Sequence, residues 1–171
     1  ITKLLLNPDP SFKGNLVGGI AGGTGNTIQI HSVDNRPYTF FVHKQIYEPS
    51  GAPIEGLYED LNRDGIINDN DLYRYKSPDP RVFMGLNSNV AFGKWNAGFV
   101  SRISLGNYNY NNIESNLGVL RQVINPQGWL GNASASYLKT GFANNQYFSD
   151  YYVQNASFFR MDNINIGYDA G

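Results

Sequence analysis

The 171-residue chain contains no cysteine, few charged residues and no long hydrophobic run. The absence of cysteine excludes disulfide bonds and metal sites built on thiolates. Charged residues make up 16% of the chain and the net charge is −1, which argues against a nucleic-acid partner because phosphate binding needs a basic surface. No apolar run reaches the length of a transmembrane helix. Membrane-spanning β-strands stay compatible with the sequence, because each needs only about 10 residues of alternating polarity.

Helical periodicity is also scarce. No stretch of about a dozen residues repeats apolar side chains at intervals of three and four. Asn, Gly, Tyr and Ser are abundant instead, and this composition favours turns and weakly charged strands. Two short runs, 27–33 and 38–47, have the composition of β-strands. The sequence therefore predicts a β-rich fold.

The clearest pattern is a strand, turn and strand at 81–106. Apolar residues alternate with Asn, Gly and Ser before Gly93, and the alternation resumes after Lys94. Gly93 and Lys94 are predicted to form a two-residue turn, since glycine readily adopts the positive φ that such hairpins need. The predicted apolar face comprises Val82, Met84, Leu86, Ser88, Val90, Phe92, Trp95, Ala97, Phe99, Ser101, Ile103 and Leu105.

A soluble antiparallel sheet alternates in the same way, so the pattern alone leaves two readings open. Two details favour a membrane strand. Each strand runs for about 11 residues, where five or six is usual in soluble sheets. The polar face carries Asn, Gly and Ser rather than Lys and Glu, which suits a water-filled lumen. A last alternation places Ile164, Ile166 and Tyr168 on one face of a further strand.

A calcium-type spacing lies within the segment 48–80. Calcium loops place oxygen ligands at positions one, three, five, seven and twelve, with glycine at position six for the sharp turn. Position one is Asp60. The other ligand positions hold Asn62, Asp64, the carbonyl of Ile66 and Asp71, and Gly65 occupies position six. Asp71 is shorter than the usual glutamate, and no amphipathic helix precedes the loop. An Asx-rich turn that binds no metal is therefore the alternative.

The region 107–156 is rich in Asn, Tyr and Gly and has no strong periodicity. Its many aromatic residues argue against disorder. These aromatic side chains either stack on a sugar or peptide ligand or pack the region against itself, and the sequence leaves both open. The candidate ligand contacts are Trp129, Tyr137, Phe142, Tyr147, Tyr151 and Tyr152.

No constellation of residues predicts catalysis. His31 and His43 lie in strand-like runs without a nucleophile motif, so structural polar roles are expected for both. Asp69 and Asp71 could form a carboxylate pair, but the calcium loop already accounts for them. The chain is therefore not expected to be an enzyme.

Two blocks of the sequence resemble the late barrel region of SusC/RagA-type TonB-dependent transporters of Bacteroidetes outer membranes. The first block, 56–99, joins the acidic loop through Ser77-Pro78-Asp79-Pro80 to the aromatic hairpin, with Ser77 in place of the more common Asn. The second block, 151–168, is similar to the family pattern V-x-N-A-S-F-L-R-L-K-N-I-T-L-G-Y. Phe159 and Asp162 depart from that pattern. The two blocks occur in the family's order.

The resemblance implies import across the bacterial outer membrane. Such proteins are antiparallel transmembrane β-barrels of about 22 strands, with long extracellular loops and an N-terminal plug. A SusD-like surface lipoprotein captures an oligosaccharide or peptide ligand outside, and the TonB complex supplies energy. The plug and the TonB box have no counterpart in this sequence, so no residue role can be carried over from them.

The expected fold class is therefore an all-β partial segment of a large barrel in contact with outer-membrane lipid, and we expect the chain to be a fragment of something larger. The predicted parts are an extracellular calcium-type loop at 48–80, a transmembrane hairpin at 81–106, a long extracellular loop at 107–156 and a transmembrane strand at 157–168.

A soluble extracellular calcium-binding module that contacts carbohydrate or protein is the alternative function. Dockerin-type domains use a similar D-x-N-x-D-G repeat, but they carry two repeats with helices, and this sequence shows one repeat without them. A secreted hydrolase is a third hypothesis, which no acid–base pair supports.

Overall fold

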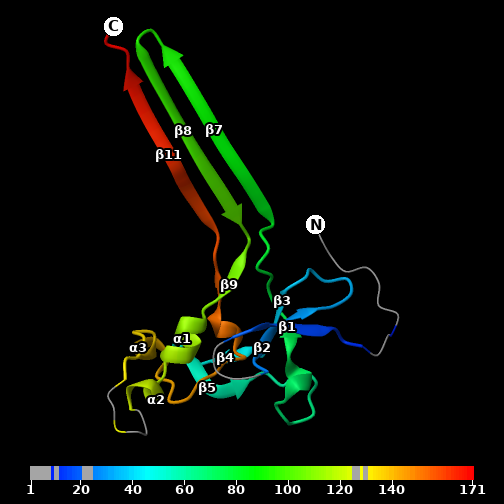
Figure 1. Ribbon diagram of the computed structural model, residues 1–171. Coiled ribbons are helices and arrows are strands. Elements are labelled where there is room, and N and C mark those ends of the chain that lie inside the picture. Colours follow the sequence, from blue (N-terminus) through cyan, green and yellow to red (C-terminus); the bar gives the residue numbers. More distant parts are fainter. Residues whose placement is uncertain (1–8, 10–11, 21–24, 125–127, 129–130) are drawn as a thin grey trace. The chain divides into compact units, whose positions relative to one another are not determined.

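The computed structural model describes residue 9 and residues 12–20, 25–124, 128 and 131–171. Its elements divide between two compact units (Figure 1). Unit 1 combines Ile1–Pro78 with Asn109–Gln154, and unit 2 combines Asp79–Tyr108 with Asn155–Gly171. Each unit therefore consists of two segments that are distant in the sequence.

Unit 1 contains short antiparallel strands. Four of them form a sheet in the order β1, β2, β3 and β6, and β4 pairs with β5 in a separate ribbon. A further pair, β9 with β10, lies where the chain passes between the units. Their bounds are β1 Asn15–Gly19, β2 Thr27–His31, β3 Thr39–Val42, β4 Gln45–Tyr47, β5 Pro53–Tyr58, β6 Tyr73–Arg74, β9 Tyr108–Tyr110 and β10 Val153–Asn155.

The structure is mostly β, and short helices add to the strands in the region 107–156. Asn111 caps the first of them, because its side-chain oxygen accepts a hydrogen bond from the amide of Glu114 at 3.1 Å. Gly141 ends the third with φ of 66°, a left-handed conformation that favours glycine. The helices are α1 Asn112–Leu117, α2 Leu120–Val123 and α3 Tyr137–Thr140, with 3₁₀ turns η1 Asp69–Asp71 and η2 Asp150–Tyr152. No helix among the described residues has the length and apolarity needed to cross a membrane.

The region 107–156 also supplies part of the core of unit 1. Val119, Phe142 and Tyr152 are at most 1% exposed, as buried as Val42 in β3. The backbone of the region bonds to the segment after β3, where the amide of His43 donates to the carbonyl of Phe148 at 2.7 Å. The side chains of Phe142 and Tyr152 therefore pack the region against the rest of unit 1, which is one of the two roles that the sequence left open.

Unit 2 is a three-stranded antiparallel sheet in the order β11, β8 and β7 (Figure 1). β7 spans Val82–Phe92, β8 spans Trp95–Leu105 and β11 spans Phe158–Tyr168, and each has 11 residues. Phe92 pairs with Trp95 across the turn, and Gly93 has φ of 57°. The predicted hairpin and its two-residue turn are confirmed.

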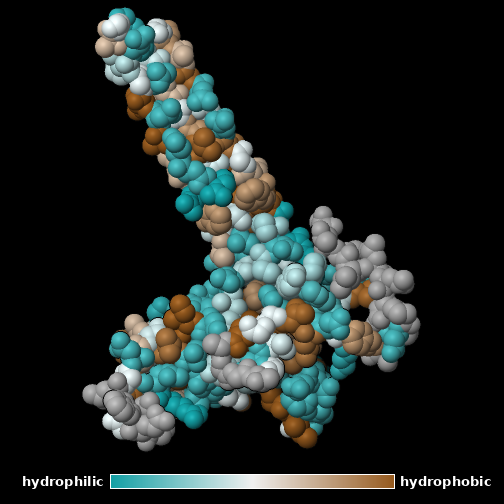
Figure 2. Space-filling model, viewed as in Figure 1, coloured by the Kyte–Doolittle hydropathy of each residue, from teal (hydrophilic) through white to brown (hydrophobic). Residues whose placement is uncertain are grey.

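The pairing register keeps the apolar side chains of unit 2 on one face. Leu86 lies opposite Ser101, and Phe99 lies between Ser88 on one side and Ile164 on the other. Among the described residues this face does not pack into a core, and Phe92 has the most exposed large hydrophobic side chain on it, at 83%. Brown hydrophobic side chains are accordingly visible at the surface of these strands (Figure 2).

On the opposite, polar face, asparagine side chains occupy the space beside glycine residues of the neighbouring strand. A Cβ atom on Gly98 would collide with the amide oxygens of Asn89 and Asn165 in the flanking strands. Gly167 likewise leaves room for the amide of Asn96. Glycine in these strands therefore serves close side-chain packing across the sheet.

A β-bulge interrupts β11 at Asp162. The register shifts between Met161, which pairs with Ser101, and Asn163, which pairs with Val100. Asp162 is the extra residue, so Met161 and Ile164 both lie on the apolar face although they are three positions apart.

Candidate functional site

The predicted calcium loop follows β5 and ends in η1. Its polar side chains fold back on the backbone: the carboxylate of Asp60 accepts from the amide of Gly65 at 2.8 Å. Asn62 accepts from the amide of Asp64 at 2.9 Å, and Asp64 accepts from the amide of Ile66 at 2.8 Å. Gly65 has φ of 82°. The loop is therefore a series of Asx turns that places alternate side chains on its inner side.

Asp71 closes the loop from its far end. Its side chain is 0% exposed, and its two carboxylate oxygens accept from the amides of Leu61 and Asn68, both at 2.9 Å. The hydrogen bond from Asn68 is the largest cause of a lowered pKa for Asp71, and burial, which acts in the opposite direction, is outweighed. Asp71 is therefore ionised at neutral pH.

The donor chemistry of the loop fits a hard cation such as Ca2+, which prefers oxygen ligands. The carboxylate oxygens of Asp60 and Asp64 that accept one backbone amide hydrogen each keep a second lone pair, whereas Oδ1 of Asp71 accepts from the amides of both Leu61 and Asn62, at 2.9 and 3.3 Å. The side-chain nitrogen of Asn62 donates to Asp64 at 2.8 Å, so a cation would have to replace this bond. Within the described residues, no group of three His, Asp or Glu side chains could hold a metal. A Ca2+ site in this loop would therefore need the amide oxygen of Asn62 and the backbone carbonyl of Ile66 as ligands in addition to the carboxylates.

The predicted ligand-contacting aromatics occupy different environments. Trp129 lies outside the described residues. Tyr152 is 1% exposed and packs edge to face against Tyr110, so it does not face solvent. Tyr147 is half-buried and donates its hydroxyl to Asn116 at 3.0 Å.

Two other candidates, Tyr137 in α3 and Tyr151 in η2, are also half-buried. Together with Tyr147 they keep part of their surface open to solvent, whereas Phe142 is 1% exposed.

A polar network around Asp150 was not predicted from the sequence. Its carboxylate accepts from the amide of Gln45 at 3.0 Å and from the hydroxyl of Tyr73 at 2.6 Å. Burial first, and then the charge of Asp150, raise the pKa of Tyr47 to about 12. Gln45 and Asp150 are 105 residues apart, and no local pattern in the sequence signals such a pairing.

His43 belongs to the same packed region. Its ring stacks on Tyr58 at a centroid distance of 4.9 Å and meets Phe148 edge to face. Its Nδ1 atom is buried and has no hydrogen-bond partner within the part of the chain that the structure describes. Burial lowers the pKa of His43, and the charges of Asp71 and Asp69 oppose this effect. The imidazole is therefore a neutral packing group, in line with the structural role expected from the sequence.

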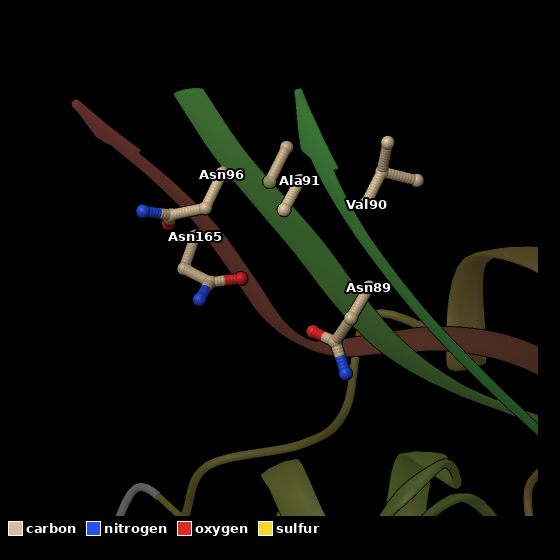
Figure 3. A pocket seen from close by; sticks show the side chains of 6 residues that line it. Asn89, Val90, Ala91, Asn96 and Asn165 are labelled. Carbon is tan, nitrogen blue, oxygen red and sulfur yellow. The ribbon is translucent and has the colours of Figure 1, made fainter. Parts of the chain in front are cut away.

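A shallow depression of about 170 Å³ lies near the hairpin turn of unit 2 (Figure 3). Three asparagine amides reach it, and they offer hydrogen-bond donors and acceptors without a titratable or nucleophilic group. The lining residues are Asn89, Val90, Ala91, Asn96, Ala97 and Asn165.

Comparison with known proteins adds a relative that covers almost the whole chain. No family model matches the sequence. The chain is 35% identical over 170 residues to the TonB-dependent receptor SusC of Bacteroides thetaiotaomicron. The match takes in 98% of this chain and 17% of that receptor.

Proposed function

The chain corresponds to a segment of a SusC-type TonB-dependent receptor, and on this premise we propose that it forms part of the barrel wall and outer mouth of an outer-membrane importer. The resemblance of the two sequence blocks agrees with the 35% identity to SusC, which extends over 98% of the chain. Transport rather than catalysis is the activity we assign. The bacterial outer membrane is the location that follows.

The two-faced sheet of unit 2 is the observation that carries the proposal. Eleven residues of antiparallel strand span roughly 37 Å, which at a tilt of about 40° corresponds to roughly 28 Å along the membrane normal, close to the apolar band of such barrels. The apolar face is open, with Val82 43%, Leu86 48%, Trp95 58% and Phe99 38% exposed. Lipid contact would remove this surface from water, whereas the Asn-rich face suits a lumen.

Cysteine labelling of the full-length receptor in outer-membrane vesicles tests this orientation. We expect a water-soluble maleimide to label Asn165→Cys and not Ile166→Cys, because adjacent strand residues face opposite sides of the sheet. Detergent solubilisation with partial unfolding should make both positions reactive, which controls for the thiol itself. Equal labelling of both positions in intact vesicles would contradict the proposal.

The strand direction supports a second part of the proposal. If the short turn at Gly93 and Lys94 faces the periplasm, as short turns do in such barrels, the segments before β7 and after β8 both lead outside. Both segments contribute to unit 1. We assign to this unit the outer mouth, where it would meet a SusD-like surface lipoprotein and an oligosaccharide or peptide ligand. The TonB complex would act through parts of the receptor beyond this segment.

We also propose that the loop 60–71 binds Ca2+ through Asp60, Asn62, Asp64, the carbonyl of Ile66 and Asp71. The all-oxygen donor set and the left-handed Gly65 support this assignment. Ca2+ would have to draw the carboxylates of Asp60, Asp64 and Asp71 together, because they do not form a metal-holding group among the described residues. A bound cation would stiffen this loop of unit 1.

Isothermal titration of the full-length receptor with Ca2+ tests the loop. We expect Asp60→Ala to abolish one class of Ca2+ binding, because it removes the first ligand. Glu48→Ala, which removes an exposed carboxylate elsewhere in the same segment, is the matched control and should bind as the native receptor does. Binding that survives Asp60→Ala would show that the cation lies elsewhere.

A soluble extracellular calcium-binding module is the alternative function, and its support is the oxygen-rich loop 60–71. The three-residue η1 does not provide the helix that a dockerin-type repeat requires. Release of the native protein from cells without detergent would favour this alternative over the importer.

A further inference from the structure

Two phenylalanine rings interrupt the polar face of unit 2. The register places Phe83, Ser104 and Phe158 in one row across the three strands. Phe83 is 63% exposed and Phe158 is 42% exposed. The proposed function places this face toward the inside of the barrel, where a bound ligand would cover this aromatic surface and remove it from water.

Two arginines occupy the next row of the same face. Arg102 donates its Nε and Nη2 atoms to the carboxylate of Asp162, at 2.6 and 2.8 Å. Arg160 approaches that carboxylate only through Nε, at 3.2 Å, and its side chain is 67% exposed. One carboxylate thus faces two guanidinium groups, and the cluster has an excess positive charge. The terminal nitrogens of Arg160 have no bonded partner among the described residues, so they can receive a second carboxylate in bidentate geometry.

The row also contains open space. Gly85 is the third member, opposite Arg102. A Cβ atom on Gly85 would meet no atom within 4 Å. The sheet is therefore uncovered between the exposed ring of Phe83 and Asn87, directly beside the two arginines.

The neighbouring row supplies hydrogen-bonding groups. Asn87 and Asn163 lie on either side of Val100, and each amide offers both donors and acceptors. Sugar hydroxyl groups need the same combination of donors and acceptors. An aromatic ring, a guanidinium with two open terminal nitrogens and amides in adjacent rows match an acidic sugar better than a peptide, whose carboxylate has no neighbouring hydroxyls.

We propose that these residues form a binding site for a uronic-acid unit of the imported oligosaccharide. We call this site the Arg160 patch; it consists of Phe83, Gly85, Arg102, Phe158 and Arg160. Arg160 receives the sugar carboxylate, and an apolar sugar face covers a phenylalanine ring. The inference rests on the proposed function, because only a water-facing patch can meet such a ligand.

Binding of trimeric galacturonic acid and its methyl ester to the full-length receptor tests the patch. Both compounds have the same carbon skeleton, and only the acid carries charge. We expect Arg160→Gln to weaken binding of the acid about tenfold or more and to leave binding of the ester unchanged. Arg160→Lys should give an intermediate loss, because lysine keeps the charge but not the bidentate geometry. Asp162 stays paired with Arg102 in both variants, so the sheet is expected to assemble.

Lys94→Gln is the matched control, because it removes one positive charge at the hairpin turn, away from the Arg160 patch. Equal affinity of the native and Arg160→Gln receptors for the acid, or no binding of the acid to the native receptor, would overturn the proposal. Competition by a tripeptide with a free carboxyl terminus as strong as that of the acid would show that the sugar assignment is wrong.

The labelling of Asn165→Cys and Ile166→Cys separates the two proposals. If only Asn165→Cys reacts and the acid does not bind, the Arg160 patch is refuted and the importer assignment stands. If the labelling pattern is reversed, the importer assignment itself is refuted.

Discussion

Burial decides the protonation state of His43. Its ring stacks on Tyr58, and its buried Nδ1 atom has no partner within the described part of the chain. A proton on this nitrogen would place a charge in a site without an acceptor. Asp71 and Asp69 attract that charge but do not outweigh the loss of hydration.

The stability of unit 1 should therefore depend on pH through His43. A lowered pKa means that the folded protein binds fewer protons than the unfolded chain below the ordinary value of 6.5. The free energy of unfolding should then fall as pH decreases through 6.5 toward the lower, folded pKa. Hydrogen exchange of the amides of Gln45 and Asp150 in the full-length receptor, compared with a His43→Phe variant at each pH, measures this effect.

His43→Phe keeps an aromatic ring against Tyr58 and removes the titrating group. The native receptor should lose protection relative to this variant between pH 7 and pH 5. An unchanged ratio of exchange rates across that range would show that another group is responsible.

The bulge in β11 shifts the alternation of side chains between the two faces of the sheet by one residue. Side chains of a strand alternate between faces, so Met161 and Ile164 could not share a face in a regular strand. The extra residue, Asp162, restores the match to β8. It also places a carboxylate between Arg102 and Arg160. One irregular position thus serves both the register and the charge pattern.

Deletions in β11 should have unequal effects on assembly. Removal of Asp162 leaves Met161 and Ile164 on the apolar face of a regular strand, so the receptor should still reach the outer membrane. Removal of Ile164 keeps the bulge and turns Asn165 and Gly167 to the apolar face, so assembly should fail. The amount of each deletion variant in isolated outer membranes, against the native receptor, measures the difference. Equal amounts of the two variants would contradict the register.

At the scale of the whole molecule, the chain passes back and forth between two units. The first unit joins the 48–78 segment to the 109–154 segment. Glu55 in β5 binds them together, because its carboxylate accepts from the amides of Ala143 at 2.7 Å and Asn144 at 2.9 Å. The candidate calcium loop and the aromatic region therefore belong to one folded body. The segments 48–78 and 109–154 therefore fold as parts of one unit.

The sequence by itself determined the hairpin, its turn at Gly93 and the two faces of its strands. These features depend on local alternation and on a single backbone conformation, so neighbouring residues are enough to specify them. It also showed the relationship to SusC-type receptors, because two blocks of side chains occur in a recognisable order. The ligand spacing of the calcium loop is local too, and its Ca2+ occupancy stays a prediction.

Only the tertiary structure decided the helices of 107–156, the burial of Phe142 and Tyr152 and the network around Asp150. Each depends on partners far along the chain, as with Gln45 and Asp150, which are 105 residues apart. The pairing of Arg160 with Asp162 likewise required the bulge and the register of β8. Contacts of this kind arise from packing, and packing does not follow from the periodicity of any single segment.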